Sequence, residues 1–301
     1  MDFSKVKDCN NANEITRAYM DGLLIESRYI DSGIPDIKLD LYGKTFDSPI
    51  MISAFSHLGN WHSNGMVEMA LGAKEANICD FVGMGDEEEL SSILSTGANC
   101  IKIIKPYADR KVIYNRLKHA YENGALAVGM DIDHSFNNKG EADVVCELLM
   151  EPITMEELGD FVKATPLPFV VKGVLSVEDA KKCMEAGVSG IVISHHHGIS
   201  PCSIPPLMIL PKIREVVGEK MKIFVDCGIA TGIDAFKALA LGATGVCVSR
   251  AILDPFKEKG ASGVEEYIGE MNQQLKSLMA RTGSSDLSKM SADVIWNGHK
   301  E

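Results

Sequence analysis

Short apolar runs rich in β-branched residues alternate with helical patterns eight times along this 301-residue chain. In the clearest unit, residues 169–174 and 190–195 are strand-like, and a Ser-x-x-acid capping box at Ser176 begins the helix between them. The near-continuous apolar character of both strands is typical of a parallel sheet covered on both faces. Eight such units predict a single (β/α)8 TIM barrel, an α/β fold. An open doubly wound sheet is the alternative, disfavoured because the chain has no G-x-G-x-x-G turn.

The other expected strands are residues 49–55, 79–84, 100–106, 126–132, 222–228 and 245–250. Residues 1–48 are expected to form a lead-in that packs on a barrel of residues 49–301. In this lead-in a helix from Ala12 to Ile25 precedes a hairpin over residues 37–46, and such a segment often closes the bottom of a barrel. Residues 133–154 follow the fourth strand and form the longest irregular stretch. They are expected to make a lid-like loop over any active site.

Composition limits the class of partner. The net charge of −12 and the pI near 5.2 argue against nucleic acid and anionic membranes, because both bind basic surfaces. A small-molecule substrate is therefore expected. The first residues lack the apolar core of a secretory signal and no apolar run is long enough to span a bilayer, so a cytoplasmic location is expected. The eight cysteines form no C-x-x-C pair, which favours reduced thiols over disulfides or a zinc site.

Polar side chains follow two neighbouring strands where the apolar runs end. Lys172 lies at the end of one strand, and residues 194–197, Ser-His-His-His, end the next. Parallel α/β sheets build their sites at the carboxyl edge of the strands. These residues are therefore candidates for a functional site.

Two long blocks carry a resemblance to a known family. They are VKGVLSVEDAKKCMEAGVSGIVISHHHG, residues 171–198, and IFVDCGIATGIDAFKALALGATGVCVSRAIL, residues 223–253. From about Arg28 to Ile295 the chain resembles the FMN-dependent α-hydroxy acid oxidases and dehydrogenases, which include glycolate oxidase, lactate oxidase and flavocytochrome b2. The resemblance implies an FMN-dependent oxidoreductase, and it allows a homo-oligomer because family members are often tetramers.

The resemblance also implies the cofactor contacts. They are Ser53, Ala54, Phe55, Gly83, Gly129, Lys172, Ser194, His196, Asp226, Gly228, Ser249 and Arg250. Lys172 would lie at the flavin N1/O2 side, where positive charge stabilises the reduced ring. Arg250 would bind the phosphate, supported by the helix N-terminus around Thr231.

The catalytic groups implied by the resemblance are His196, His197, Asp131 and Lys172. His196 aligns with the family's catalytic histidine without a gap, and His197 aligns with it if one residue is inserted. This imidazole would accept the substrate hydroxyl proton as a hydride or its equivalent moves to flavin N5. Asp131 would hydrogen-bond the imidazole and fix its tautomer. Asp133, two residues away on the same strand face, leaves that assignment open.

The substrate contacts depart from the family pattern. The two arginines that hold the substrate carboxylate fall at Gly140 and Ile199, so the bidentate clamp is missing. The remaining candidates for substrate contact are Lys105, Lys139, His195 and Ile199. In the phosphate loop, an arginine of the family pattern is replaced by Ala230, which leaves Arg250 with more of the phosphate charge.

A kept flavin site with a lost clamp predicts a changed substrate. The expected reaction is oxidation of a hydroxyl- or amine-bearing carbon without the usual α-carboxylate. The alternatives are a flavin-dependent isomerase with no net redox change, and a non-catalytic barrel that binds a phosphorylated ligand. No metal site is predicted, because nothing in the spacing of His57, His62, His134 and Asp131 demands one.

Overall fold

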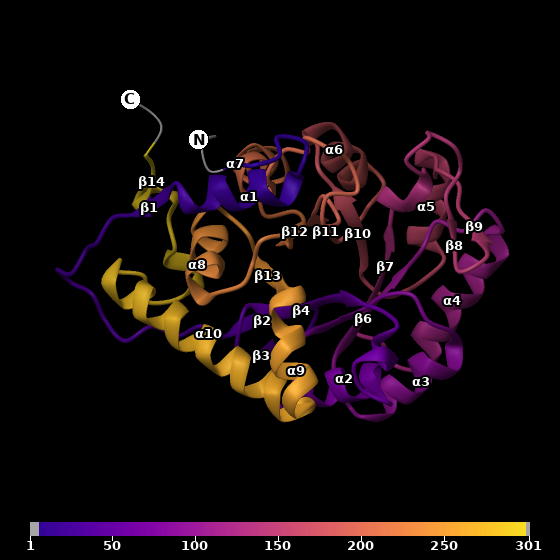
Figure 1. Ribbon diagram of the computed structural model, residues 1–301, viewed down its shortest axis with the longest axis horizontal. Helices are drawn as coiled ribbons and strands as arrows, with labels where there is room; N and C mark the ends of the chain where they lie inside the picture. The colour runs from indigo at the N-terminus through magenta and orange to yellow at the C-terminus, as the bar shows by residue number, and fades with distance from the viewer. Residues whose placement is uncertain (1–5, 299–301) are drawn as a thin grey trace.

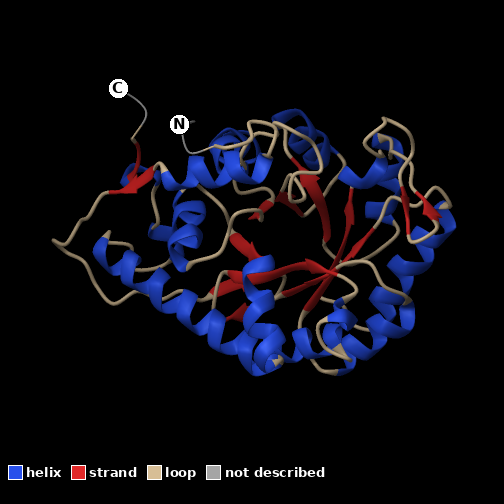
Figure 2. Ribbon diagram, viewed as in Figure 1, coloured by secondary structure: helices blue, strands red, loops and turns tan. Residues whose placement is uncertain are grey.

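The computed structural model describes residues 6–298; residues 1–5 of the expected lead-in and 299–301 of the expected barrel segment lie outside it. Parallel strands form a closed barrel with helices around it (Figures 1 and 2). Around the barrel they follow chain order: β4 (Ile50–Phe55), β5 (Asp80–Val82), β6 (Cys100–Ile104), β7 (Ala127–Asp131), β10 (Phe169–Val174), β11 (Gly190–Ile193), β12 (Lys222–Val225) and β13 (Gly245–Val248), which pairs with β4. The predicted (β/α)8 barrel is confirmed.

A helix follows each barrel strand (Figure 2). These are α2 (Gly65–Glu75), α3 (Glu87–Ser95), α4 (Arg110–Glu122), α5 (Met155–Lys163), α6 (Val177–Glu185), α7 (Pro206–Val217), α8 (Gly232–Ala240) and α9 (Leu253–Lys259), and α10 (Ala261–Arg281) packs against α2 and α8. The cap predicted at Ser176 is present, since its Oγ accepts a hydrogen bond from the backbone N–H of Asp179 at 2.9 Å. Thr154 and Thr231 cap α5 and α8 with full capping boxes. Local side-chain caps thus decide where these helices begin.

The barrel interior changes from apolar to polar along the strands. At the amino end of the strands, the apolar side chains inside the barrel form a cluster that we call the lower core. It contains Met51, Cys79, Phe81, Ile101, Ile103, Ala127, Val170, Val192, Phe224 and Cys247. Side chains alternate along a strand, so the next inward position after Val170 is Lys172. Steps of two residues, or of four past Gly129 in β7, lead to the buried polar layer of Ser53, Lys105, Asp131, Lys172, Ser194 and Asp226. The polar layer lies at the carboxyl end of the barrel, where the sequence predicts the site.

The helix expected from Ala12 to Ile25 is only partly present. α1 (Ala12–Asp21) ends earlier, and β1 (Leu23–Ile25) pairs antiparallel with β14 (Ile295–Asn297). The prediction was wrong over β1. The strand that pairs with β1 lies at the other end of the chain, and the periodicity of the local sequence carries no information about so distant a partner.

The lead-in reaches both ends of the barrel. The hairpin of β2 (Leu39–Leu41) and β3 (Lys44–Phe46) packs its apolar side chains into the lower core and closes the bottom. α1 lies at the opposite end, where Thr16 Oγ1 is 2.8 Å from His195 Nε2. The N-terminal segment therefore supports the floor of the barrel and also the back of the candidate site.

The lid-like loop contains secondary structure of its own. After the turn η3 (Asp133–Ser135), the strands β8 (Val144–Val145) and β9 (Leu148–Leu149) form an antiparallel hairpin. Cys146 Sγ at its tip lies 3.8 Å from His57 Nε2 in the loop after β4. The loop thus reaches across to the β4 side of the barrel mouth. Within residues 6–298, no helix combines the length and apolar character needed to cross a bilayer.

Candidate active site

A cavity of about 310 Å³ opens at the carboxyl end of the barrel, within the size range of small-molecule sites. Its lining consists of Ser53, Ala54, Phe55, Ser56, Leu58, Trp61, Lys172, His196, His197, Asp226, Cys227, Gly228, Ser249, Arg250 and Leu253. Most of these residues belong to the set predicted from the sequence. The two predicted cations, Lys172 and Arg250, line the same cavity.

Two lysines hold the buried carboxylate of Asp131 between them. Lys172 Nζ lies 3.3 Å from Asp131 Oδ1, and Lys105 Nζ lies 2.6 Å from Oδ2. Burial opposes ionisation, but the neighbouring cations, Lys172 first, hold the pKa of Asp131 well below its usual range. Burial likewise disfavours the Lys172 ammonium, yet the nearby carboxylates, Asp131 first, raise its pKa. Lys172 therefore stays positively charged at the cavity floor.

The loop after β11 brings His196 to the cavity. His196, His197 and Gly198 all have positive φ, at 46°, 58° and 84°. The backbone N–H of His196 donates to Ser194 Oγ at 3.0 Å, which fixes the first step of the turn. Left-handed backbone at two successive histidines costs free energy, and such strain is concentrated at functional sites. This turn lets the His196 ring line the cavity while its Nδ1 faces the carboxylates after β7.

Asp133 makes a shorter contact with His196 than Asp131 does. His196 Nδ1 lies 2.8 Å from Asp133 Oδ1 and 3.4 Å from Asp131 Oδ1. Gly173 leaves space for this carboxylate, because a Cβ there would lie 2.6 Å from Asp133 Oδ2. Asp131 is already held by two ammonium groups. The geometry therefore favours Asp133, the alternative left open by the sequence, as the group that orients His196.

The carboxylates also set the protonation of His196. Burial lowers the pKa of this imidazole, but the carboxylates, Asp131 first, outweigh it and raise the pKa to about 9. Burial, and then the charge of Asp131, raises the pKa of Asp133. His196 accordingly holds its proton firmly at neutral pH.

His134, in the lid-like loop, contacts His196 from another side. The Nε2 atoms of the two rings are 3.3 Å apart, and the rings meet edge to face with centroids 4.4 Å apart. His134 Nδ1 lies 3.2 Å from Asp143 Oδ2. Burial, followed by the charges of Lys105 and His196, lowers the pKa of His134. These contacts connect the loop directly to the predicted base.

Four residues here offer possible metal ligands. One ligand atom from each of Asp131, Asp133, His134 and His196 lies within 4.8 Å of the others, a donor set suited to a divalent cation. However, Lys172 Nζ lies 3.1 Å from His196 Nδ1 and also contacts Asp131. An ammonium group therefore already supplies positive charge among these donors. The cluster is better suited to holding protons than to holding a metal ion.

Asp226 lies buried below the other side of the cavity. Cys227 Sγ donates to Asp226 Oδ1 at 3.0 Å, and Ser53 Oγ donates to Oδ2 at 3.4 Å. Burial, and then the Asp226 charge, raises the pKa of Cys227 well above its ordinary value. Cys227, which is not in the predicted set, therefore remains a protonated thiol rather than a nucleophile.

The predicted phosphate end is formed differently from the sequence expectation. The Arg250 guanidinium is exposed at the start of η4 (Arg250–Ile252) and forms no ion pair with any residue from 6 to 298. The backbone N–H groups of residues 230–232 already donate to the side chains of Asp234 and Gln274. These three N–H groups are thus already engaged, and Arg250 is a group that remains available to a phosphate.

Some predicted residues do not line the cavity: Gly83, Gly129, Asp131, Ser194, Lys105, Lys139, His195 and Ile199. His195 is buried, and its ring contacts Thr16 Oγ1 at 2.8 Å and the backbone N–H of Gly198 at 2.9 Å. Lys139 is exposed in the lid-like loop. The geometry gives no support to substrate contacts from His195 or Lys139, because one ring is fully engaged and the other side chain faces solvent.

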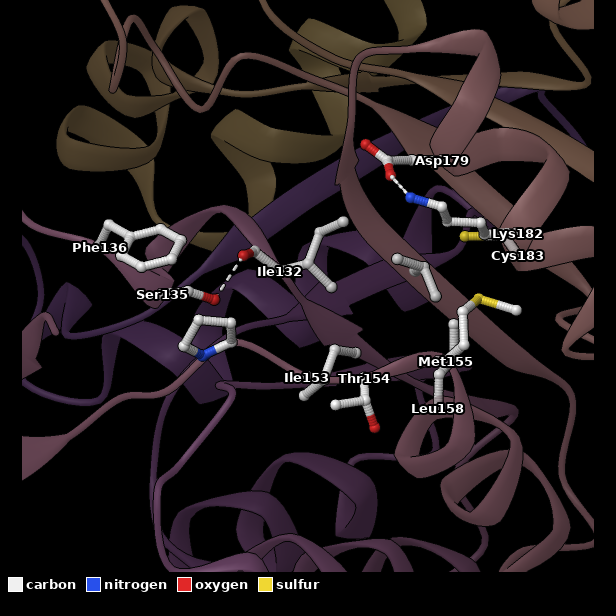
Figure 3. A pocket seen from close by; sticks show the side chains of 12 residues that line it. Ile132, Ser135, Phe136, Ile153, Thr154, Met155, Leu158, Asp179, Lys182 and Cys183 are labelled. Atoms are coloured by element: carbon white, nitrogen blue, oxygen red, sulfur yellow. Dashed lines mark hydrogen bonds and ion pairs between the residues drawn. The ribbon is translucent and has the colours of Figure 1, made fainter. Parts of the chain in front are cut away.

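A second cavity, of about 260 Å³, lies between the barrel wall and helices α5 and α6 (Figure 3). Its walls are mainly apolar, with Ile132, Met155 and Leu158 among them, and Asp179 and Lys182 form an ion pair at 3.6 Å. None of the predicted catalytic or cofactor residues lines it. The cavity at the barrel mouth is therefore the candidate site.

Comparison with known proteins identifies the family. The model of the FMN-dependent dehydrogenases matches residues 4–154 and 137–297. The chain belongs to this family. The predicted family, the FMN cofactor and the class of flavin-dependent oxidoreductase are confirmed, with the substrate left open.

Relatives within the FMN-dependent dehydrogenase family cover nearly the whole chain. A 2-hydroxyacid oxidase from Dictyostelium discoideum is 25% identical and aligns with 92% of this chain and 80% of its own length. Glycolate oxidase from Spinacia oleracea is 26% identical over 87% of this chain and 82% of its own length. The structure of mandelate oxidase superposes with a TM-score of 0.86 at 22% identity, covering 96% of this chain and 90% of that one. The structural likeness supports the barrel fold.

The cavity residues fit the FMN of this family. Arg250 offers an unpaired guanidinium for a phosphate, and Lys172 offers a buried ammonium for a ring that becomes anionic on reduction. Gly228, with φ of 84°, lines the cavity, and a Cβ there would lie 2.8 Å from Met20 Sδ, so the close approach of α1 requires glycine at this position. The charges of the chain are thus complementary to both ends of the cofactor.

Proposed function

We propose that this FMN-dependent dehydrogenase oxidises a hydroxyl- or amine-bearing carbon that has no adjacent carboxylate. The supporting observation is the lack of a free cation for such a group around His196 in the described residues. Gly140 and Ile199 occupy the positions where the family's carboxylate-binding arginines align. Neither residue can form the two parallel hydrogen bonds of a guanidinium.

The lysines do not replace these arginines. Lys105 Nζ is bound to Asp131 at 2.6 Å and is largely buried. Lys139 lies exposed in the lid-like loop, outside the cavity lining. Arg250, which is unpaired, is assigned to the FMN phosphate. A substrate carboxylate near His196 would therefore lack a charged partner, and a neutral substrate suits the site better.

In the proposed reaction each of these side chains has a separate role. When bound, FMN would supply the acceptor for the hydride of the substrate carbon. His196 takes the hydroxyl proton at Nε2, opposite the Nδ1 that faces Asp133. Because its pKa is raised to about 9, the neutral imidazole that can do so becomes the main form only above that pH. Asp133 fixes the tautomer and stabilises the imidazolium that forms. Lys172 keeps positive charge at the cavity floor, and Arg250 anchors the cofactor.

Anaerobic flavin bleaching tests this substrate class. The purified protein is mixed with mandelate, lactate or glycolate, and in parallel with neutral alcohols and amines of similar size, such as benzyl alcohol. The neutral compounds are expected to reduce the flavin faster. An Ile199→Arg variant is expected to gain activity with mandelate, whereas Ile199→Leu, the matched control, is not. Rapid bleaching of the wild-type flavin by simple hydroxy acids contradicts the proposal, and turnover without an electron acceptor would favour an isomerase.

We also propose that the chain forms a homo-oligomer. Tyr29, Ile30 and Ile34 are 66%, 91% and 98% exposed on the segment between β1 and β2, which projects from one end of the molecule (Figure 1). Large apolar side chains gathered on one exposed segment mark an interaction site. Light scattering is expected to show an assembly that the double substitution Ile30→Asp and Ile34→Asp dissociates. A wild-type monomer would contradict this.

A further inference from the structure

The cysteines fall into a buried group and an exposed group. Five are buried: Cys79, Cys100, Cys183, Cys227 and Cys247. Burial is the main cause that raises the pKa of each of these five thiols, so they stay protonated. Cys9, Cys146 and Cys202 are exposed. Reactions with small molecules in solution are therefore expected at these three residues.

Two of the exposed cysteines are in contact, although they lie far apart in the sequence. Cys202 Sγ donates a hydrogen bond to the carbonyl oxygen of Cys9 at 3.3 Å. The backbone N–H of Cys202 donates to the carbonyl oxygen of Asn10 at 3.1 Å, which holds the two segments together. Cys146 lies instead against His57, at the tip of the lid-like loop.

The two thiols are close enough to react with each other. A carbonyl oxygen lies about 2.4 Å from the Cα of its own residue, so Cys202 Sγ is no more than about 5.7 Å from the Cα of Cys9. Both residues lie in exposed turns, where a side-chain rotation and a small backbone shift close the remaining distance. Exposed disulfides of this kind are easily reduced and serve regulation rather than stability.

We propose that Cys9 and Cys202 form a reversible disulfide with a small disulfide, such as oxidised glutathione, as the oxidant. One of the two thiolates attacks a sulfur of oxidised glutathione, which breaks its S–S bond and releases one glutathione thiolate. The other cysteine then attacks the mixed disulfide and releases the second. The two protein thiols lose two electrons in total, oxidised glutathione gains them, and the two thiol protons pass to the released glutathione.

The disulfide would fasten the lead-in to the loop that carries the histidines. Two hydrogen bonds already join these segments: Asn13 Nδ2 donates to the carbonyl oxygen of His197 at 3.0 Å, and Thr16 Oγ1 lies 2.8 Å from His195 Nε2. His197 lines the cavity at the barrel mouth. In Figure 1, α1 lies beside α7, the helix that follows this loop. A covalent bond would keep the two segments together when the hydrogen bonds break.

The lead-in also contacts the opposite side of the cavity. Arg17 Nη1 lies 3.3 Å from the carbonyl oxygen of Gly228, which lines the cavity, and Met20 packs against the same glycine. Helix α1 therefore supports two of the loops around the expected FMN. Release of FMN requires these loops to move apart, and the disulfide would oppose this local opening.

The test uses the FMN-loaded protein, treated with oxidised glutathione and compared with the same sample after dithiothreitol. Peptide mass analysis is expected to find the peptides of Cys9 and Cys202 joined, with the loss of two hydrogen atoms. In Cys9→Ser and Cys202→Ser, the remaining cysteine of the pair is expected to keep one bound glutathione. Cys146→Ser is the matched control, because it removes the third exposed cysteine and leaves the link intact.

The rate of FMN release, followed by flavin fluorescence after dilution, is the second readout. In the wild type and Cys146→Ser, oxidation is expected to slow release roughly 3- to 10-fold, a local share of the usual effect of a disulfide. In Cys9→Ser and Cys202→Ser, oxidation is expected to change the rate less than about twofold.

Two results would overturn the inference. Glutathione on both cysteines without a link between them, or a link from either one to Cys146, excludes the disulfide. A link between Cys9 and Cys202 that leaves FMN release unchanged excludes its action on the cavity. Neither readout involves a substrate, so both are independent of the proposed reaction.

Discussion

Replacing Asp133 by asparagine tests which carboxylate orients His196. The asparagine keeps the shape of the side chain and removes its charge. A charge-assisted hydrogen bond, here at 2.8 Å, contributes about 1.5–3 kcal/mol, and one pKa unit corresponds to about 1.4 kcal/mol. The pKa of His196 is therefore expected to fall from about 9 by roughly one to two units. A histidine titration by nuclear magnetic resonance measures this directly.

The same substitution changes the pH dependence of stability. The folded-state pKa of His196 is raised, to about 9, so its stabilising contribution is fully present below the ordinary value near 6.5 and is lost as pH rises through about 9. This shift corresponds to about 3 kcal/mol, which Asp133→Asn is expected to reduce to about 1–2 kcal/mol. Urea unfolding at both ends of this pH range measures the difference.

Asp131→Asn is the companion variant. It removes the carboxylate that pairs with two buried lysines, so it is expected to lower the free energy of unfolding by about 3–5 kcal/mol.

If Asp133→Asn leaves the His196 titration unchanged, Asp133 does not orient the ring and the assignment from distance is refuted.

Three further substitutions have direct outcomes. Arg250→Leu is expected to weaken FMN binding roughly 10- to 100-fold, measured by fluorescence titration, because the unpaired guanidinium of the cavity is lost. Gly129→Ala is expected to cost about 3 kcal/mol of unfolding free energy, since its Cβ would overlap the carbonyl oxygen of Val170; unchanged urea unfolding would contradict this. Thr16→Val leaves the buried His195 Nε2 without its 2.8 Å partner and is expected to cost about 1–3 kcal/mol in the same assay.

The sequence alone was sufficient to predict the barrel, because the patterns that indicate its strands and helices are local. Alternation along each strand places Lys172 in the same inward column as Val170, and an apolar run that ends in a polar residue marks the carboxyl edge. Capping residues such as Ser176 lie within one turn of the helices that they begin. Such signals can be read from a short window of residues. The sequence alone was therefore enough to predict the fold class and to place the site at the carboxyl end of the barrel.

The side-chain partners within the site depend on contacts between distant segments. Nothing near His134 in the sequence indicates that its ring meets His196, because a turn with positive φ sets that contact. The sequence pattern puts Asp131 and Asp133 on one strand face, so periodicity could not choose between them. The structure distinguishes them, because Lys105, directly after β6, pairs with Asp131. Similarly, His195 looks available in the sequence, but Thr16 from α1 already uses its ring.

Because β1 pairs with β14, loss of structure at β14 would also affect the N-terminal segment of the chain. The segment that holds β14 also fixes β1, and β1 follows directly on the helix that carries Thr16 and Arg17. Arg17 contacts the carbonyl oxygen of Gly228, beside the expected phosphate position. Fraying of the last strand would therefore loosen α1 and free the loops that surround the flavin, so cofactor loss should accompany it.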